Sequence, residues 1–87
     1  MDYRDRRYYM VYIYNYWSIN GIISLLKRIP SWKFHIHENE KGTLYVKVMV
    51  SYKFEDDKIF NEVKDYIKEK MPKQVKFELL SKENLGQ

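Results

Sequence analysis

One stretch near the start of the chain decides the fold: Tyr8-Tyr9-Met10-Val11-Tyr12-Ile13-Tyr14-Asn15-Tyr16. Tyrosine, valine and isoleucine are residues that β-strands favour. Alternate residues of a strand point to opposite faces of a sheet, and here both sets are apolar or aromatic. A strand with two such faces is typical of the middle of a sheet, so the stretch predicts a central strand.

A helix is predicted directly after this strand. Isoleucine and leucine recur at helical spacing from Ile19 to Ile29. Ser18 is a candidate N-cap, and Pro30 is expected to end the helix.

A second helix is predicted to begin near Asp56 or Asp57 and to end before Pro72. Its apolar stripe consists of Ile59, Phe60, Val63, Tyr66 and Ile67. We interpret the Asp56–Asp57 pair as helix capping rather than as a catalytic dyad.

Between the helices, two runs of alternating apolar and polar residues predict a β-hairpin. Its inward residues are Trp32, Phe34 and Ile36 on the first strand and Leu44, Val46, Val48 and Val50 on the second. Residues 38–42 supply the turn. A last strand is predicted within residues 73–80, with Val75, Phe77 and Leu79 inward.

This order of elements predicts an α+β domain of the ferredoxin-like βαββαβ type. Its antiparallel sheet would have four strands, the first and third in the centre, with both helices on one face. The 87 residues provide for a single domain. We expect an N-terminal arm (1–7), a core (8–80) and a flexible tail (81–87). The expected core residues are Trp32, Phe34, Val46, Val48, Ile59, Phe60, Val63, Ile67 and Phe77.

Composition narrows the class of protein. With 0 Cys, the chain can form neither disulfides nor a thiolate metal site. No apolar run approaches the roughly 20 residues of a membrane helix, and residues 1–7 do not resemble a signal peptide. We therefore expect a cytoplasmic protein without membrane contact. The net charge of +4 is mild and does not by itself demand a polyanionic partner.

The sheet face without helices is expected to be rich in Tyr, Met, His and Lys. The helix positions that face outward carry mixed charges typical of a solvated surface. We therefore expect contact with partners through the open sheet face. The candidate residues for binding a partner or a nucleic acid are Tyr12, Tyr14, Tyr45, Lys33, His35, Lys47 and Lys76.

Two segments resemble the paired signatures of the RNA-recognition motif. Residues 11–16 resemble the hexamer on that family's first strand, and residues 41–48 resemble the octamer on its third strand. The resemblance implies that Tyr12 and Tyr45 stack on unpaired bases. Thr43 and Leu44 depart from the pattern, since the family usually has a stacking aromatic and a small residue there.

A protein–protein role is the alternative that we favour. Tyr and Met are preferred at interfaces, so the same face could pair with a second copy or with a protein that the chain regulates. The composition suits a viral or mobile-element accessory factor, such as an inhibitor. The sequence thus predicts a small interaction module, with single-stranded RNA or DNA binding as the other hypothesis.

No catalytic residues are predicted. His35 and His37 would share a strand face, but a catalytic zinc site uses three protein ligands. The sequence offers no nucleophile with its base and no phosphate-binding glycine loop. We therefore expect neither a metal nor a cofactor, and no enzymatic activity.

Overall fold

The computed structural model describes residues 6–37 and 44–80. The strands are β1 (Arg6–Ile13), β2 (Lys33–His37), β3 (Val46–Lys53) and β4 (Val75–Leu79), and the helices are α1 (Ile19–Leu26) and α2 (Asp57–Lys70). Short 3-10 helices, η2 (Tyr16–Ser18) and η3 (Phe54–Asp56), precede α1 and α2. The second helix therefore begins where it was predicted to begin.

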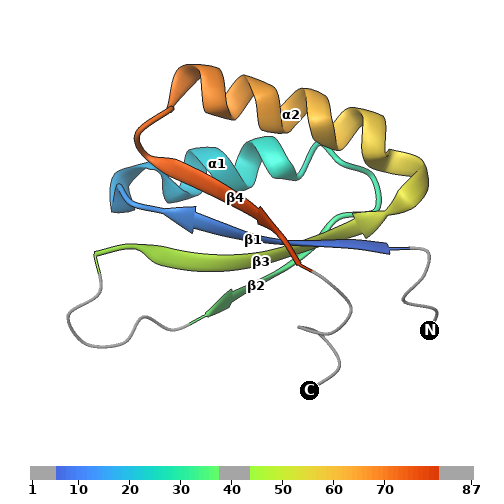
Figure 1. The fold of residues 1–87 in the computed structure, drawn as a ribbon, viewed down its shortest axis with the longest axis horizontal. Helices are drawn as coiled ribbons and strands as arrows, with labels where there is room; N and C mark the ends of the chain where they lie inside the picture. Colours follow the sequence, from blue (N-terminus) through green and yellow to red (C-terminus); the bar gives the residue numbers. More distant parts are fainter. Residues whose placement is uncertain (1–5, 38–43, 81–87) are drawn as a thin grey trace.

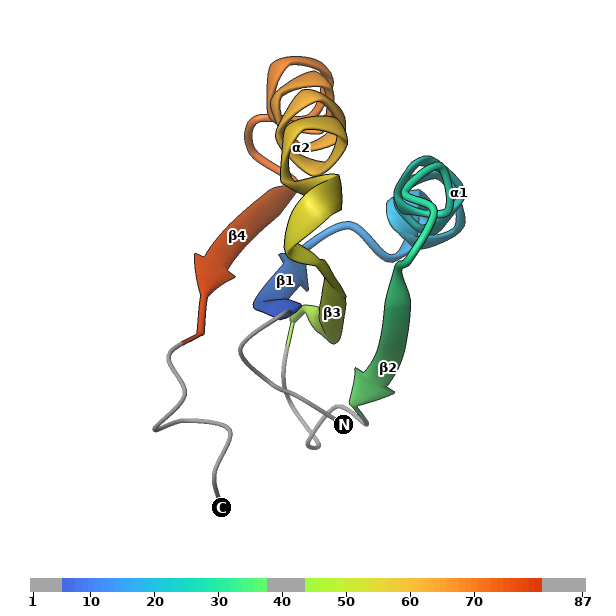
Figure 2. The same ribbon diagram turned by 90° about the vertical axis from the view of Figure 1, so that its right-hand side faces the viewer.

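The four strands form one antiparallel sheet in the order β2-β3-β1-β4. Both helices lie on the same side of it, and the opposite side has no helix over it (Figure 1, Figure 2). The ferredoxin-like βαββαβ prediction is confirmed, including the central position of β1 and β3.

The core lies between the sheet and the helices. Val11 and Ile13 of β1 are fully buried, as are Val48 and Val50 of β3. The largest aromatic contacts are made by Phe60 of α2, whose ring centroid is 4.3 Å from that of Tyr52 and 4.6 Å from that of Tyr9. The other fully buried apolar side chains are those of Ile22, Leu26, Ile29 and Ile67.

Four side chains of the strand segments that were predicted to be inward are exposed instead, and so is Tyr66 of the predicted helical stripe, at 47%. Phe34 and Ile36 on β2 and Leu79 on β4 are 41%, 43% and 58% exposed, because an edge strand has a neighbour on one side only. The ring of Phe34 stacks on that of Trp32 at 4.5 Å. Leu44 is 84% exposed, since it precedes the first residue of β3. Among the predicted core residues, Phe34 is therefore wrong, whereas Val46, Val48, Phe60, Val63 and Ile67 are buried.

The chain enters the first helix differently from the prediction. Ser18 makes no side-chain cap bond; its hydroxyl donates to Oε1 of Gln74 at 3.3 Å. The cap is supplied earlier by Asn15, whose side-chain oxygen accepts from the backbone N–H of Trp17 at 3.0 Å. Asn15 is thus the N-cap of η2, two residues after the end of β1.

Asp56 is the N-cap residue of α2, in agreement with the interpretation as helix capping, but its side chain makes no cap hydrogen bond. Oδ2 of Asp56 accepts from both the backbone N–H and the hydroxyl of Ser31. Oδ1 of Asp57 accepts from the Tyr52 hydroxyl at 2.5 Å, and its Oδ2 accepts from the Asn61 amide at 3.3 Å. These carboxylates connect α2 to β3 and to the turn before β2, which is a structural role.

The first strand begins at Arg6, so Arg6 and Arg7 belong to the sheet rather than to the predicted arm. The predicted turn at 38–42, residues 1–5 of the arm and the tail at 81–87 lie outside the described residues. Within the described part of the chain, no helix is long and apolar enough to cross a membrane.

Candidate functional site

The open face carries a compact group of tyrosines, Tyr12, Tyr14 and Tyr45, which we call the aromatic cluster. The ring of Tyr45 lies 5.4 Å from that of Tyr12 and 5.3 Å from that of Tyr14, with interplanar angles of 68° and 60°. Edge-to-face contacts of this kind stabilise aromatic pairs beyond the area they bury. The pairing of Ile13 with Val46 brings the end of β1 and the start of β3 together, and so places the three rings in contact.

Two lysines and one glutamate surround the aromatic cluster. Nζ of Lys76 lies 5.5 Å from the ring centre of Tyr12, and Nζ of Lys47 lies 5.8 Å from that of Tyr45. Ammonium groups at these distances are attracted to the ring faces. The hydroxyl of Tyr12 donates to Oε1 of Glu78 at 3.0 Å. Partial burial and this bond raise the pKa of Tyr12 above its ordinary value.

Three large side chains at the same end of the sheet are strongly exposed and were not predicted as site residues. Trp17 is 92%, Leu44 is 84% and Tyr16 is 72% exposed. Trp17 and Tyr16 sit on η2, which Asn15 fixes at the end of β1, while Leu44 precedes β3. One feature of the sequence could have indicated their exposure. Tyr16 and Trp17 directly follow Asn15, which can cap a helix, and they precede the apolar residues that recur at helical spacing from Ile19 on.

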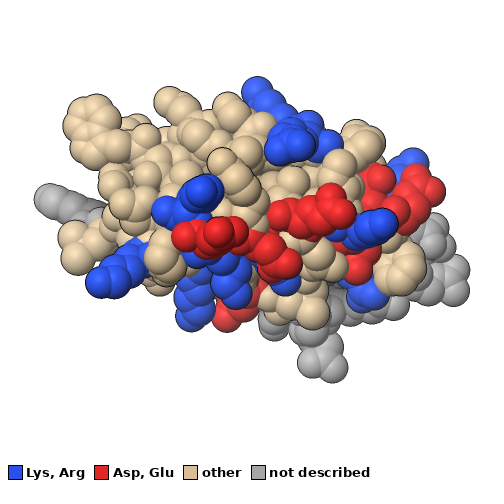
Figure 3. All heavy atoms as spheres, turned by 90° about the horizontal axis from the view of Figure 1, so that it is seen from above, with Lys and Arg blue, Asp and Glu red and all other residues tan. Residues whose placement is uncertain are grey.

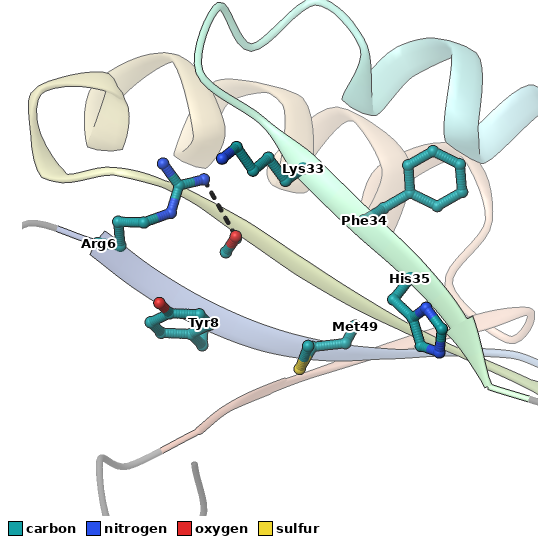
Figure 4. A pocket seen from close by; sticks show the side chains of 7 residues that line it. Arg6, Tyr8, Lys33, Phe34, His35 and Met49 are labelled. Carbon is teal, nitrogen blue, oxygen red and sulfur yellow. Dashed lines mark hydrogen bonds between the residues drawn. The ribbon is translucent and has the colours of Figure 1, made fainter. Parts of the chain in front are cut away.

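The other predicted site residues lie elsewhere on the open face. Lys33 and His35 of β2 line a hollow of about 230 Å³, together with Arg6, Tyr8, Met49 and Ser51 (Figure 4). Phe34 also borders it, but its ring points away from the hollow. The structure thus divides the seven predicted residues: Tyr12, Tyr14, Tyr45, Lys47 and Lys76 lie together, and Lys33 and His35 lie apart from them.

The histidine pair does not form a metal centre with other described residues. The rings of His35 and His37 are 5.1 Å apart and nearly perpendicular. Within residues 6–37 and 44–80, no group of three His, Cys, Asp or Glu side chains could hold a metal ion. Nε2 of His37 is buried and has no hydrogen-bond partner in that part of the chain.

The two sides of the molecule differ in charge. On the helix side, lysines and arginines are interspersed with aspartates and glutamates over the surface (Figure 3). The described strand residues of the open face include the cations Arg6, Lys33, Lys47 and Lys76 and one carboxylate, that of Glu78. Because the carboxylate of Glu78 accepts a hydrogen bond from the Tyr12 hydroxyl, part of the charge of Glu78 is compensated within the face.

No protein-family model matches the sequence, and a comparison with curated proteins finds no match either. Among solved structures, the fold is similar to that of a de novo designed protein, Foldit4, at 17% identity and a TM-score of 0.53, over 87% of this chain and 94% of the designed one.

Two natural proteins show weaker similarity. A PII-like signalling protein from Thermus thermophilus is 7% identical with a TM-score of 0.48, over 93% of this chain and 95% of that one. CPII from Thiomonas intermedia, bound to ADP, AMP and acetate, is 9% identical with a TM-score of 0.49, over 87% of each chain. Likeness at these identities concerns the fold alone, so the function has to be argued from the site.

Proposed function

We propose that this chain is a non-catalytic interaction module that binds an acidic surface of another protein through its open sheet face. The observation that carries the proposal is the aromatic cluster on the open face. Trp17 and Leu44 add exposed apolar surface at the same end of the sheet. Tyrosine and tryptophan are the residues that dominate binding energy in protein interfaces.

The charge of the face defines the chemistry of the partner. Lys47 and Lys76 flank the aromatic cluster, and Glu78 is bonded to Tyr12. A partner with acidic side chains around an apolar centre would complement this arrangement and would be steered toward it.

A second copy of the chain is a poorer occupant of the same face. Two open faces brought together would place two predominantly basic surfaces against each other, at a cost in repulsion. Pairing along an edge strand, β2 or β4, avoids this repulsion. Self-association is thus a separate prediction, and light scattering at high micromolar concentration tests it.

Binding of single-stranded RNA or DNA is the second candidate function, and the proximity of Tyr12 and Tyr45 favours it. Bases stack on flat, accessible ring faces. Here Tyr12 and Tyr45 meet edge to face, and a lysine lies over each of these two rings, so a base would have to displace an ammonium group. We therefore rank nucleic acid second.

The test uses affinity selection from a random peptide library displayed on phage, with the full chain as bait. We expect the selected peptides to be rich in Asp and Glu around aromatic or aliphatic residues. They should bind the wild type but not the double variant Tyr12→Ala with Tyr45→Ala. The matched control, Glu62→Ala with Lys68→Ala on α2, should bind as the wild type does.

Two results would contradict the first candidate. Peptides that bind the double variant as tightly as the wild type would place the interface elsewhere. Binding of a labelled single-stranded oligonucleotide that disappears in the double variant and weakens steeply with salt, without any selected peptide, would establish the second candidate instead.

A further inference from the structure

We propose that the hollow beside β2 is a binding site for a small oxyanion, a phosphate or carboxylate group carried on a compact apolar or aromatic body. The hollow is distinct from the aromatic cluster, and the proposal does not depend on a protein partner. It stands on three observations: the way the strands form the hollow, the cations that line it, and the rigid placement of Arg6.

Strand register creates the hollow. Tyr8 of β1, Ser51 of β3 and Lys33 of β2 lie in one row across the sheet. Ser51 is the smallest of the three and occupies the middle, so the open face is depressed between two long side chains. The next row, which includes Met49 and His35, forms a second wall. The volume of about 230 Å³ is below the usual range for drug-sized ligands.

The charges that line the hollow have one sign. Arg6 and Lys33 point toward one another over it, and His35 adds an imidazole (Figure 4). None of the described residues that line it carries a carboxylate. Two cations held near one another repel, and an oxyanion between them would relieve that repulsion while accepting charge-assisted hydrogen bonds.

Arg6 is fixed before any ligand arrives. Its Nη2 donates to the backbone oxygen of Ser31 at 2.9 Å and to Oγ of Ser51 at 3.0 Å. Ser31 is itself held, because its backbone N–H and its hydroxyl donate to Asp56. A guanidinium that is already ordered loses less entropy when it binds an anion, and its other N–H groups remain donors.

The carboxylates of Glu55 and Asp56 do not line this hollow. Glu55 and Asp56 line a neighbouring hollow that Arg6 and Lys33 also border. Oδ2 of Asp56 accepts the two bonds from Ser31, which directs that oxygen toward the turn before β2.

The apolar part of the site is supplied by Met49 and the ring of Tyr8, which would contact the body that carries the anion.

The test is titration of the full chain with three probes, phenyl phosphate, inorganic phosphate and phenol, followed by backbone amide NMR shifts. We expect phenyl phosphate to saturate and to shift the amides of residues 33–35 and 49–51. Inorganic phosphate should bind more weakly, because it lacks the apolar body, and phenol should not saturate, because it lacks the charge. Benzoate in a fourth titration distinguishes a carboxylate from a phosphate.

Three variants separate the contributions of the Lys33 charge, of the open volume of the hollow and of the net charge of the protein. Lys33→Gln should weaken phenyl phosphate binding about tenfold, since it removes one charge-assisted bond. Ser51→Leu should abolish binding by filling the hollow. Lys68→Gln on α2 removes the same charge far from the hollow and should change the affinity less than about twofold. A melting curve of each variant checks that it is folded.

The proposal is overturned if neither phenyl phosphate nor benzoate saturates up to about 10 mM, a weak limit on the affinity scale. It is also overturned if Lys33→Gln and Lys68→Gln weaken binding equally, because the attraction would then be to net charge. Inorganic phosphate binding as tightly as phenyl phosphate would contradict the apolar part of the site. Because Lys33→Gln does not touch the Arg6 contacts, its result stands even if Ser51→Leu fails to fold.

Discussion

The two halves of the open face are built by the same strands and yet offer opposite shapes. At one end β3 is preceded by Tyr45, which meets Tyr12 and Tyr14 and forms a raised group of rings. At the other end β3 presents Met49 and Ser51, and the face sinks into a hollow.

The difference teaches that side-chain size along the β3 segment shapes the face. Ser51 is small and leaves a depression between Tyr8 and Lys33, whereas the ring of Tyr45, directly before β3, packs against Tyr12 and Tyr14. The aromatic half is suited to a large partner surface, and the hollow is suited to a small ligand. A substitution that affects only one half of the open face shows that the two halves are independent, and one that affects both shows that they depend on each other.

The largest effect is expected from Phe60→Ala, which should destabilise both halves together. The Phe60 ring packs against Tyr52 and Tyr9 on the helix side of the sheet, with no exposed surface. Loss of a buried phenyl ring costs about 3–5 kcal/mol, a large share of the stability of a small domain. Chemical denaturation measures the change, with the exposed Tyr66→Ala as control. A loss below about 1 kcal/mol would contradict the described core.

The next effect should be confined to the aromatic half. Trp17→Ala is expected to weaken peptide binding by about 2 kcal/mol, roughly thirtyfold, if Trp17 is an anchor of the interface. It should leave the melting temperature and the phenyl phosphate affinity unchanged, because the side chain is 92% exposed and follows the C-terminal end of β1, whereas Arg6 and Tyr8 at the N-terminal end of β1 line the hollow. Calorimetric titration with both ligands checks this. A fall in both affinities would show that the two halves are coupled.

Much of this comparison was accessible from the sequence, because period-two alternation fixes which residues share a face. It placed Tyr12, Tyr45, Lys33 and His35 on the open face correctly, and the spacing of apolar residues gave both helices. What alternation cannot give is distance along the face. Lys33 and Tyr12 share a face but lie in different rows, and only the register of β2 on β3 separates them.

Other features depend on side-chain contacts between segments far apart in the chain. The prediction of Arg6 as part of an arm failed because its partners, Ser31 and Ser51, are 25 and 45 residues away. Phe34 followed the inward pattern, but it lies on an edge strand, where its ring stacks on Trp32. Trp17 belongs to a 3-10 turn that has no apolar periodicity.

A smaller effect is expected beneath the hollow, where Tyr52 adjoins Ser51 on β3 and donates to Asp57. Tyr52→Phe should cost about 1–2 kcal/mol, because it removes a buried bond to a carboxylate that retains Asn61. Burial, followed by the bond to Asp57, raises the pKa of Tyr52 far above its ordinary value.

The alkaline dependence of stability follows from that shift. A phenol with a raised folded-state pKa stabilises the fold fully below about pH 10, where the unfolded chain titrates, and this contribution is lost as the pH rises further. Wild type should therefore lose stability above about pH 10 more steeply than Tyr52→Phe does. Denaturation between about pH 8 and 11 checks this, with exposed Tyr66→Phe as control. Parallel pH curves for wild type and Tyr52→Phe would contradict the raised pKa of Tyr52, to which burial contributes most and the bond to Asp57 next.

The smallest effect is expected from Tyr12→Phe in the aromatic half. The hydroxyl bond to Glu78 lies at the surface, so its loss should cost only about 0.5 kcal/mol of stability. The ring itself remains against Tyr45, so peptide binding should fall far less than in the Tyr12→Ala with Tyr45→Ala variant. Partial burial and Glu78 raise the pKa of Tyr12, so its small contribution is likewise complete below about pH 10 and lost above it. Peptide titration and denaturation of Tyr12→Phe beside Tyr52→Phe compare what the two hydroxyls contribute to binding and to stability. If Tyr12→Phe proved the more destabilising of the two, the carboxylate bond on the open face would contribute more to stability than the one beneath the hollow.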